Sequence, residues 1–183
     1  YPNIIGSAYQ SLPPSIRSLH DSNRPRAWYG YASVRRGLNP ISRLIGWIIG
    51  FPPASARTDV TVHFKPDEKG GELWTRNFGE REFSSYQYAG KGRDTHLIVE
   101  RFGPISVSLA VTLQERRLHL ITRRWKLWNL PLPRALMPGG DSFESEVDGN
   151  FCFDVTIKVP LIGLIAVYKG TLKPATSDYN APS

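Results

Sequence analysis

The sequence holds one cysteine among its 183 residues, Cys152, so the chain can form no internal disulfide and no cysteine-rich zinc site. It has no apolar run of the roughly 18 to 20 residues that a membrane-spanning helix requires, and no leader of basic and then apolar residues follows Tyr1. The nucleophile turn GxSxG, the dinucleotide turn GxGxxG and histidine pairs with HxH or HxxxH spacing are missing too. We therefore expect no metal ion or other cofactor, no α/β-hydrolase chemistry, and a cytoplasmic location.

The composition is that of a folded, strand-rich protein. Hydrophobic residues make up 40% of the chain, which is enough for a core. Eight tyrosines, eight phenylalanines, five tryptophans, 16 glycines and 15 prolines favour strands and turns over a helical bundle. Neither a linker nor an internal repeat divides the sequence, so we predict one domain over residues 1–175 and a flexible tail at 176–183.

Positive charge exceeds negative charge, with 23 Lys and Arg against 16 Asp and Glu and a net charge of +7. This balance is compatible with nucleic acid, an anionic membrane surface or an acidic ligand as partner. In the densest basic stretch, Arg123, Arg124 and Lys126 interleave with Trp125 and Trp128, a mixture that can stack on bases and neutralise phosphates. Alternation along a strand divides these residues between two faces, however, so a charged edge strand is the better interpretation.

Two regions have the periodicity of helices. Apolar residues over 3–21 fit two short helical pieces, and residues 40–50 fit a longer helix that begins after the cap Asn39. Only Ser42 and Arg43 of the longer helix are clearly polar, and a helix that is apolar nearly all round is usually buried. We therefore predict that it packs inside the fold, with contact to a membrane surface as the alternative.

The rest of the sequence alternates with the period of strands, joined by short turns with no helix between them. Such a chain forms an antiparallel meander, and a long flat sheet would expose its edges, so we expect curling or closure. The predicted fold is α+β and mainly antiparallel β: a curved sheet or half-open barrel, calycin-like or helix-grip-like, over the apolar helix and the N-terminal helical pieces. The predicted strands are 27–34, 58–65, 72–78, 82–88, 94–102, 105–113, 116–128, 142–147, 151–159 and 164–172.

Several short motifs together resemble one family. They are Trp74-x-Arg76-x-Phe78, Glu100-Arg101-x-Gly103-Pro104, Leu130-Pro131-Leu132-Pro133, Pro160-Leu161-x-Gly163 and Tyr168-x-Gly170. In combination, over roughly residues 4–173, the chain is similar to a bacterial family known as domain of unknown function 4166. Members of that family occur alone or fused behind an NAD-binding domain that resembles saccharopine dehydrogenase. The resemblance implies no reaction and no catalytic residue.

Charged residues inside predicted strands are the best guide to a site. Arg76 shares a strand face with Trp74 and Phe78, and either Glu100 or Arg101 must point toward apolar neighbours. A buried charge is costly unless it is paired, so an Arg76–Glu100 ion pair across strands is one interpretation. The other is a polar group inside an apolar cavity, which orients a ligand or donates a proton.

Three functions follow from these patterns. The first is binding of a hydrophobic or amphipathic small molecule by Tyr29, Tyr31, Trp74, Arg76, Phe78, Arg101 and Tyr168. The second is a cofactor-free cyclase, isomerase or dehydratase, with Glu100 or Asp154 as acid or base and Arg76 or Arg101 stabilising an oxyanion. Binding of nucleic acid comes third. The oligomeric state cannot be predicted from the sequence.

Overall fold

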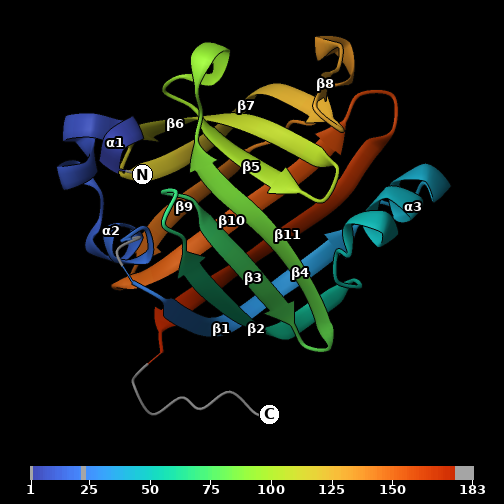
Figure 1. Cartoon of the computed structure of the whole chain (residues 1–183). Coiled ribbons are helices and arrows are strands. Elements are labelled where there is room, and N and C mark those ends of the chain that lie inside the picture. Colours follow the sequence, from blue (N-terminus) through green and yellow to red (C-terminus); the bar gives the residue numbers. More distant parts are fainter. Residues whose placement is uncertain (1, 22–23, 176–183) are drawn as a thin grey trace.

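The computed structural model describes residues 2–21 and 24–175, and the predicted tail at 176–183 lies outside them. Ten antiparallel strands close into a barrel (Figure 1). They are β1 (Arg26–Arg36), β2 (Ser55–Pro66), β3 (Glu72–Phe78), β4 (Arg81–Ala89), β5 (Ile98–Phe102), β6 (Ile105–Gln114), β7 (Arg117–Leu127), β9 (Ser142–Val147), β10 (Asn150–Val159) and β11 (Gly163–Pro174). The predicted antiparallel, mainly β architecture is confirmed, and the sheet closes fully.

Most neighbouring strands follow one another in sequence, and two further pairings, of β1 with β11 and of β7 with β9, close the barrel. Strand β1 pairs with β11 along most of its length and so joins the two ends of the sheet. Strand β7 pairs with β9 through only two residue pairs, Leu118 with Glu144 and His119 with Phe143. Beyond this joint, the two-residue strand β8 (Leu130–Pro131), the short helix η3 (Arg134–Leu136) and Gly139, which bridges to Lys158, continue the wall.

One predicted strand is shorter than expected. The alternation predicts a strand over 94–102, but β5 begins at Ile98. The preceding residues form the single-turn helix η2 (Gly92–Asp94), and His96 has a left-handed φ of 67° that interrupts an extended chain.

The N-terminal segment closes one end of the barrel. It consists of α1 (Pro2–Ile5), η1 (Gly6–Ser11) and α2 (Pro14–Leu19), as the helical periodicity predicts. Pro14 opens α2, where the missing backbone N–H costs nothing. Leu12, Ile16 and Leu19 are fully buried in the core, so this end of the barrel is plugged.

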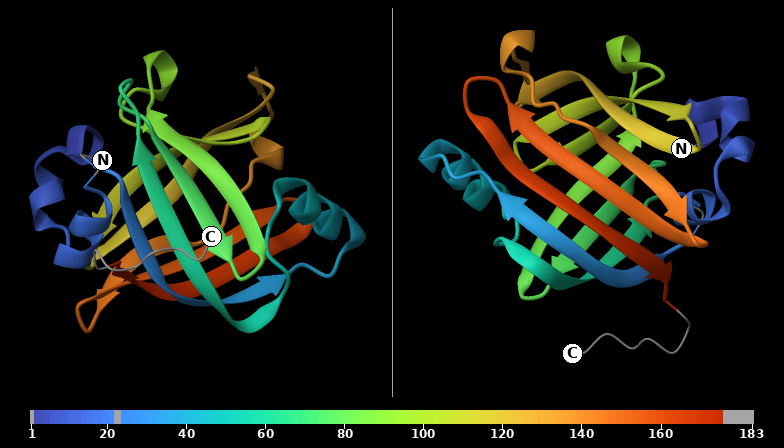
Figure 2. Two further views of the ribbon diagram at one scale, coloured as in Figure 1. Left: turned by 60° about the horizontal axis from the view of Figure 1, so that its bottom comes forward. Right: turned by 180° about the vertical axis from the view of Figure 1, so that it is seen from behind.

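The helix α3 (Pro40–Ile49) lies at the opposite end of the barrel (Figures 1 and 2). It begins as predicted, because the side chain of Asn39 accepts a hydrogen bond from the backbone N–H of Ile41 at 2.8 Å. It ends at Gly50, whose φ of 82° is the left-handed conformation typical of a helix C-terminus.

The prediction that this helix packs inside the fold is wrong. Of its side chains, only Ser42 and Gly46 are buried, whereas more than half of each of four apolar side chains is exposed. The position a Gly46 side chain would take is filled by the guanidinium of Arg36. The helix therefore rests on the barrel through these small residues and the half-buried Ile45 and Ile49, and it turns outward Ile41, Leu44, Trp47 and Ile48.

Candidate functional site

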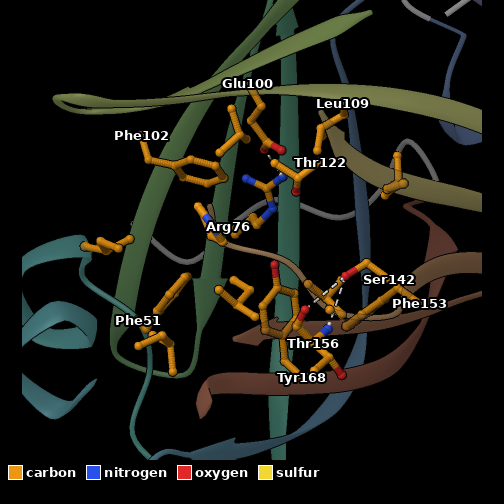
Figure 3. A pocket seen from close by; sticks show the side chains of 18 of the residues that line it. Phe51, Arg76, Glu100, Phe102, Leu109, Thr122, Ser142, Phe153, Thr156 and Tyr168 are labelled. Carbon is orange, nitrogen blue, oxygen red and sulfur yellow. Dashed lines mark hydrogen bonds and ion pairs between the residues drawn. The ribbon is translucent and has the colours of Figure 1, made fainter. Parts of the chain in front are cut away.

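A cavity of about 390 Å³ occupies the interior of the barrel (Figure 3). A volume of this size is typical of sites for small molecules. Its walls are the side chains that alternate strand positions bring to the inner face, and most of them are apolar. They include Val60, Val62, Phe64, Phe78, Phe102, Val107, Leu109, Phe151, Phe153 and Val155.

A compact polar cluster interrupts these apolar walls. Nη1 of Arg76 donates a hydrogen bond to Oγ of Ser85 at 2.7 Å, and Nη2 of Arg76 lies 3.1 Å from Oε1 of Glu100. The hydroxyl of Ser85 donates to the same carboxylate oxygen at 2.6 Å. The three residues therefore form a closed triangle, in which a buried positive charge is balanced by a buried negative one.

Three neighbouring strands supply this cluster. Arg76 lies on β3, Ser85 on β4 and Glu100 on β5, and the register pairs Trp74 with Ser85 and Gln87 with Glu100. Because side chains alternate between the two faces of a strand, this register directs all three toward the barrel axis. The guanidinium of Arg76 also lies 5.0 Å from the ring centre of Trp74, a cation–π contact that holds it against the wall.

Tyr168 on β11 faces the cluster from the opposite side of the cavity (Figure 3). Burial raises the pKa of its hydroxyl to about 12; the charge of Arg76 opposes this rise, and that of Glu100 adds to it. Within residues 2–21 and 24–175, this hydroxyl has no hydrogen-bond partner. Tyr168 therefore presents a neutral donor and acceptor to anything that enters the cavity.

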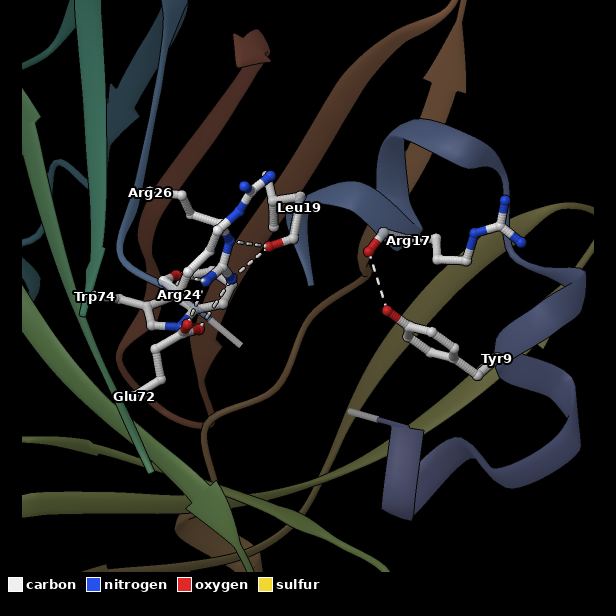
Figure 4. A network of polar contacts seen from close by, with 7 residues as sticks. All are labelled: Tyr9, Arg17, Leu19, Arg24, Arg26, Glu72 and Trp74. Carbon is white, nitrogen blue, oxygen red and sulfur yellow. Dashed lines mark hydrogen bonds and ion pairs between the residues drawn. The ribbon is translucent and has the colours of Figure 1, made fainter. Parts of the chain in front are cut away.

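A second polar network forms the floor of the barrel beside α2 (Figure 4). Arg26 of β1 donates from Nε to the backbone carbonyl of Leu19 at 2.8 Å and forms an ion pair with Glu72 of β3. Glu72 also accepts a hydrogen bond from the indole N–H of Trp74 at 2.7 Å. Tyr9 of η1 donates to the carbonyl of Arg17 at 3.1 Å, which ties the N-terminal segment together.

One residue of α2's end reaches the cavity floor directly. Nε2 of His20 lies 2.5 Å from Oε2 of Glu144, which lines the cavity, and the imidazole is almost completely buried. The ring of His20 also packs 5.7 Å from that of Trp74. The polar contacts of the floor are thus internal to the protein, and they hold α2 in place as a plug.

The mouth of the cavity lies at the α3 end. The lining residues near α2, such as Leu19 and Phe64, are fully buried. Those near α3, Ile45, Ile49 and Ile162, are half-buried. The cavity is therefore more open at the α3 end than at the α2 end.

Comparison with known protein families places this chain in one of them. The family described as Domain of unknown function (DUF4166) matches residues 12–172, from just before α2 into the last strand of the barrel. The chain belongs to the DUF4166 family. The match reaches every strand and includes every residue of the Arg76 cluster, so the cavity is part of the DUF4166 domain itself. Among proteins with curated descriptions, none is similar enough to this chain to count as a match.

The structure brings five of the predicted site residues of this DUF4166 domain together. Trp74, Arg76, Phe78, Glu100 and Tyr168 all line the cavity. The ion pair between Arg76 and Glu100 that the sequence suggested is present, and it lies inside the cavity. The two interpretations of these charges, an ion pair across strands and a polar group in an apolar cavity, therefore apply to the same residues.

Four other predicted site residues lie on the outside of the barrel. Tyr29, Tyr31 and Arg101 are exposed, and the guanidinium of Arg57 covers the ring of Tyr31 at 3.9 Å. Asp154 forms an ion pair with Lys169 at 2.6 Å on the outer surface. Each is one residue away from an inward-facing neighbour, and the two-residue period turns it away from the cavity.

Sequence reasoning missed several residues of the site. Ser85 could have been found, because alternation on its strand groups it with the buried Phe83 and Gln87. Thr122 and Trp125 both line the cavity, although they are three residues apart, because a register shift opposite Ser108 and Leu109 changes the face of β7. No periodic signal marks the residues of the irregular segment that line the cavity, Leu132, Pro138, Gly139 and Gly140.

The basic strand separates Trp125 from two of its charged neighbours. The indole of Trp125 faces the cavity, and its N–H donates to the carbonyl of Pro133 at 3.0 Å. Arg124 and Lys126 lie on the outside, where both pair with Asp94, at 3.0 and 3.2 Å. The aromatic ring and the charges are therefore on opposite faces of β7.

Metal-binding groups and membrane-spanning helices were also sought. Within the described part of the chain, no three His, Cys, Asp or Glu side chains are grouped so that they could hold a metal ion. None of the helices in the described ranges is long and apolar enough to cross a membrane.

Proposed function

We propose that this chain binds a hydrophobic or amphipathic small molecule inside its barrel. The observation that carries this function is the mainly apolar cavity of about 390 Å³ with one inward-facing polar cluster at Arg76, Ser85 and Glu100. A well-packed interior leaves few voids larger than a water molecule, so a space of this size calls for an occupant.

The polar cluster favours a ligand with a neutral polar group. Arg76 and Glu100 neutralise each other, so a ligand carboxylate would have to displace Glu100 or bring an uncompensated charge into the cavity. A hydroxyl or carbonyl group has no such cost. It can accept from the remaining N–H groups of Arg76 and exchange hydrogen bonds with the hydroxyl of Tyr168.

Native mass spectrometry of gently purified protein, compared with its denatured mass, tests the proposal. We expect an added mass of a few hundred daltons that is lost on denaturation. Where no ligand is retained during purification, 1-dodecanol and dodecanoate serve as probes, and we expect the alcohol to bind more tightly. A chain that carries no copurified molecule and takes up neither probe would overturn the proposal.

Neighbouring residues of β5 provide a matched control. Glu100 points into the cavity, whereas Arg101 is exposed on the outer face. We expect Glu100→Gln to change the affinity for 1-dodecanol and Arg101→Gln to leave it unchanged. Circular dichroism of both variants separates a loss of binding from a loss of fold. Equal effects of the two variants would show that the cavity is not where the probe binds.

A cofactor-free enzyme on the same scaffold is the second candidate. The supporting observation is that Glu100, a possible acid or base, and Arg76, a possible oxyanion partner, lie 3.1 Å apart inside the cavity. This activity would convert the bound molecule to a product of different mass or retention time. We expect Glu100→Gln to abolish conversion while the substrate remains bound. Conversion at an undiminished rate would remove Glu100 from the reaction.

A further inference from the structure

Helix α3 presents an apolar face that nothing in the described chain covers. Ile41, Leu44 and Ile48 follow a three- and four-residue spacing, which places them on one side of the helix, and Trp47 extends that side. Each is more than half exposed. Contiguous apolar surface of this kind marks a site of contact with another phase or molecule.

The exposed apolar surface continues beyond the helix. Leu38 precedes α3 and is 92% exposed, and Leu161, at the turn between β10 and β11, is 95% exposed. The two segments are neighbours, because the backbone N–H of Gly37 donates to the carbonyl of Ile165 at 3.0 Å. Leu161 also has a left-handed φ of 67°, an uncommon conformation for leucine that is kept while the side chain faces water.

The shape of this surface favours a lipid layer over a peptide as partner. The apolar side chains belong to a raised helix and to a separate turn at the same end of the barrel (Figures 1 and 2). Projections of this kind do not form a groove for a peptide, but they can insert side by side into a lipid surface. Tryptophan is the residue most at home at the boundary between lipid and water, and Trp47 is the most exposed apolar residue of α3.

The charges within the chain segment that carries α3 are all of one sign. Residues 35–50 contain Arg35, Arg36 and Arg43 and no Asp or Glu. Arg35 and Arg43 are exposed, whereas Arg36 is occupied by the backbone carbonyls of Phe51 and Pro52. Exposed arginines beside an apolar face are attracted to anionic lipid headgroups. The ten-residue helix is too short to cross a bilayer, so it would lie in the headgroup region.

We infer that α3, together with Leu38 and Leu161, docks this protein on the surface of an anionic lipid bilayer. The flank of the helix that packs against the barrel carries the half-buried Ile45 and Ile49, which line the mouth of the cavity. Docking therefore places the mouth against the lipid, so that an apolar ligand moves between bilayer and cavity without crossing water. This last step rests on the proposed function, whereas the docking itself does not.

Flotation of the full chain with phosphatidylcholine vesicles, with and without phosphatidylserine, tests the docking. We expect binding to vesicles that contain phosphatidylserine, and a loss of about tenfold or more in affinity for Trp47→Ser/Ile48→Ser, because buried apolar area is removed. Arg43→Glu should weaken binding only where phosphatidylserine is present. Each variant is checked by circular dichroism, and because these side chains are exposed, we expect the fold to be kept.

A matched pair of single substitutions controls for loss of apolar surface in general. Ile41 on α3 and Val147 at the opposite end of the barrel are each 54% exposed. We expect Ile41→Ser to weaken vesicle binding and Val147→Ser to have no effect. Equal losses for the two variants, or no binding of the unchanged chain to either kind of vesicle, would overturn the inference.

Two further measurements separate the remaining outcomes. If light scattering shows a dimer that becomes a monomer in Trp47→Ser/Ile48→Ser, and neither form binds vesicles, the surface contacts a second copy and the inference is wrong. Uptake of 1-dodecanol, measured by native mass spectrometry without vesicles, reports on the cavity alone. A chain that binds vesicles but takes up no ligand refutes the proposed function and leaves the docking intact; the reverse result refutes the docking.

Discussion

Nη2 of Arg76 lies 3.1 Å from Oε1 of Glu100, although the two residues come from strands β3 and β5, which do not pair with each other. The long arginine side chain spans the intervening strand β4, and the hydroxyl of Ser85 on that strand bonds to both partners. The ion pair therefore braces three strands from inside the barrel while it also forms the polar end of the cavity.

Removing the positive member of this pair should destabilise the protein. In Arg76→Met the carboxylate of Glu100 stays largely buried without its countercharge, which costs about 3 kcal/mol of unfolding free energy. In the double variant Arg76→Met/Glu100→Gln no charge is left unpaired, and we expect most of that loss to be recovered. Urea unfolding of both variants measures the difference. Equal losses would mean that the two charges are not coupled.

The ionisation of Tyr168 should follow its raised pKa. Burial holds the folded-state pKa at about 12, against an ordinary value of 10.0, so the phenol stays protonated in the folded chain after it ionises in the unfolded chain. Its contribution to stability is complete below pH 10 and is lost as the pH rises toward 12, by an amount on the order of 2 kcal/mol.

The difference in absorbance at alkaline pH between the unchanged chain and Tyr168→Phe isolates this titration. The comparison matters because a hydrogen bond to Asp67 also raises the pKa of Tyr86 to about 12. Tyr86→Phe serves as the second reference. A difference curve for Tyr168 that is centred near pH 10 would show that water and ions reach its hydroxyl freely.

The two ends of the barrel should respond differently to the same truncation. Ile16 of α2 is 0% exposed, whereas Ile48 of α3 is 61% exposed. We expect Ile16→Ala to cost about 2–5 kcal/mol, because it leaves a cavity in the plug, and Ile48→Ala to change stability by about 0.5 kcal/mol or less. Thermal or urea unfolding gives both values. A large loss for Ile48→Ala would mean that its face is packed in solution.

Adding a methyl group at Gly46 should loosen α3. A Cβ there would lie 1.8 Å from Nη2 of Arg36, which must move and release the carbonyls of Phe51 and Pro52, both 2.9 Å from its Nη1. Alanine gains about 1 kcal/mol in helix propensity, but each hydrogen bond lost from a charged group costs about 1.5–3 kcal/mol, so the loss prevails. Hydrogen exchange over residues 37–52 should accelerate in Gly46→Ala. Unchanged exchange would show that Arg36 is not what holds the helix.

Alternation along the strands predicted much of the site but could not always choose the inner face. On β3 the pattern grouped Trp74, Arg76 and Phe78 correctly, because all three share one face of a seven-residue strand. On β1 both faces carry aromatic residues, so nothing in the sequence distinguished Trp28, which is buried, from Tyr29, which is exposed. Faces of this kind are told apart only by long-range pairing.

Two other features could not be predicted because they depend on what covers a segment. The apolarity of residues 40–50 predicted the helix but not its partner, because the strands that were expected to cover it close into a barrel and leave it at one end. The irregular stretch before β9 has no period at all, yet Leu132 and Pro138 complete the wall where β7 and β9 separate. In both cases contacts with distant parts of the chain determine which residues are buried, and the local sequence does not predict those contacts.

The pairing of β1 with β11 has a consequence for biosynthesis. Trp28 is matched with Pro174, so the first and last strands of the barrel can meet only after nearly all the described residues have been translated. Until then the inner face of the sheet is an open apolar surface on a ribosome-bound chain, available to chaperones but unable to retain a small molecule. Under the proposed function, the barrel can therefore retain a bound molecule only after β11 has emerged and paired with β1.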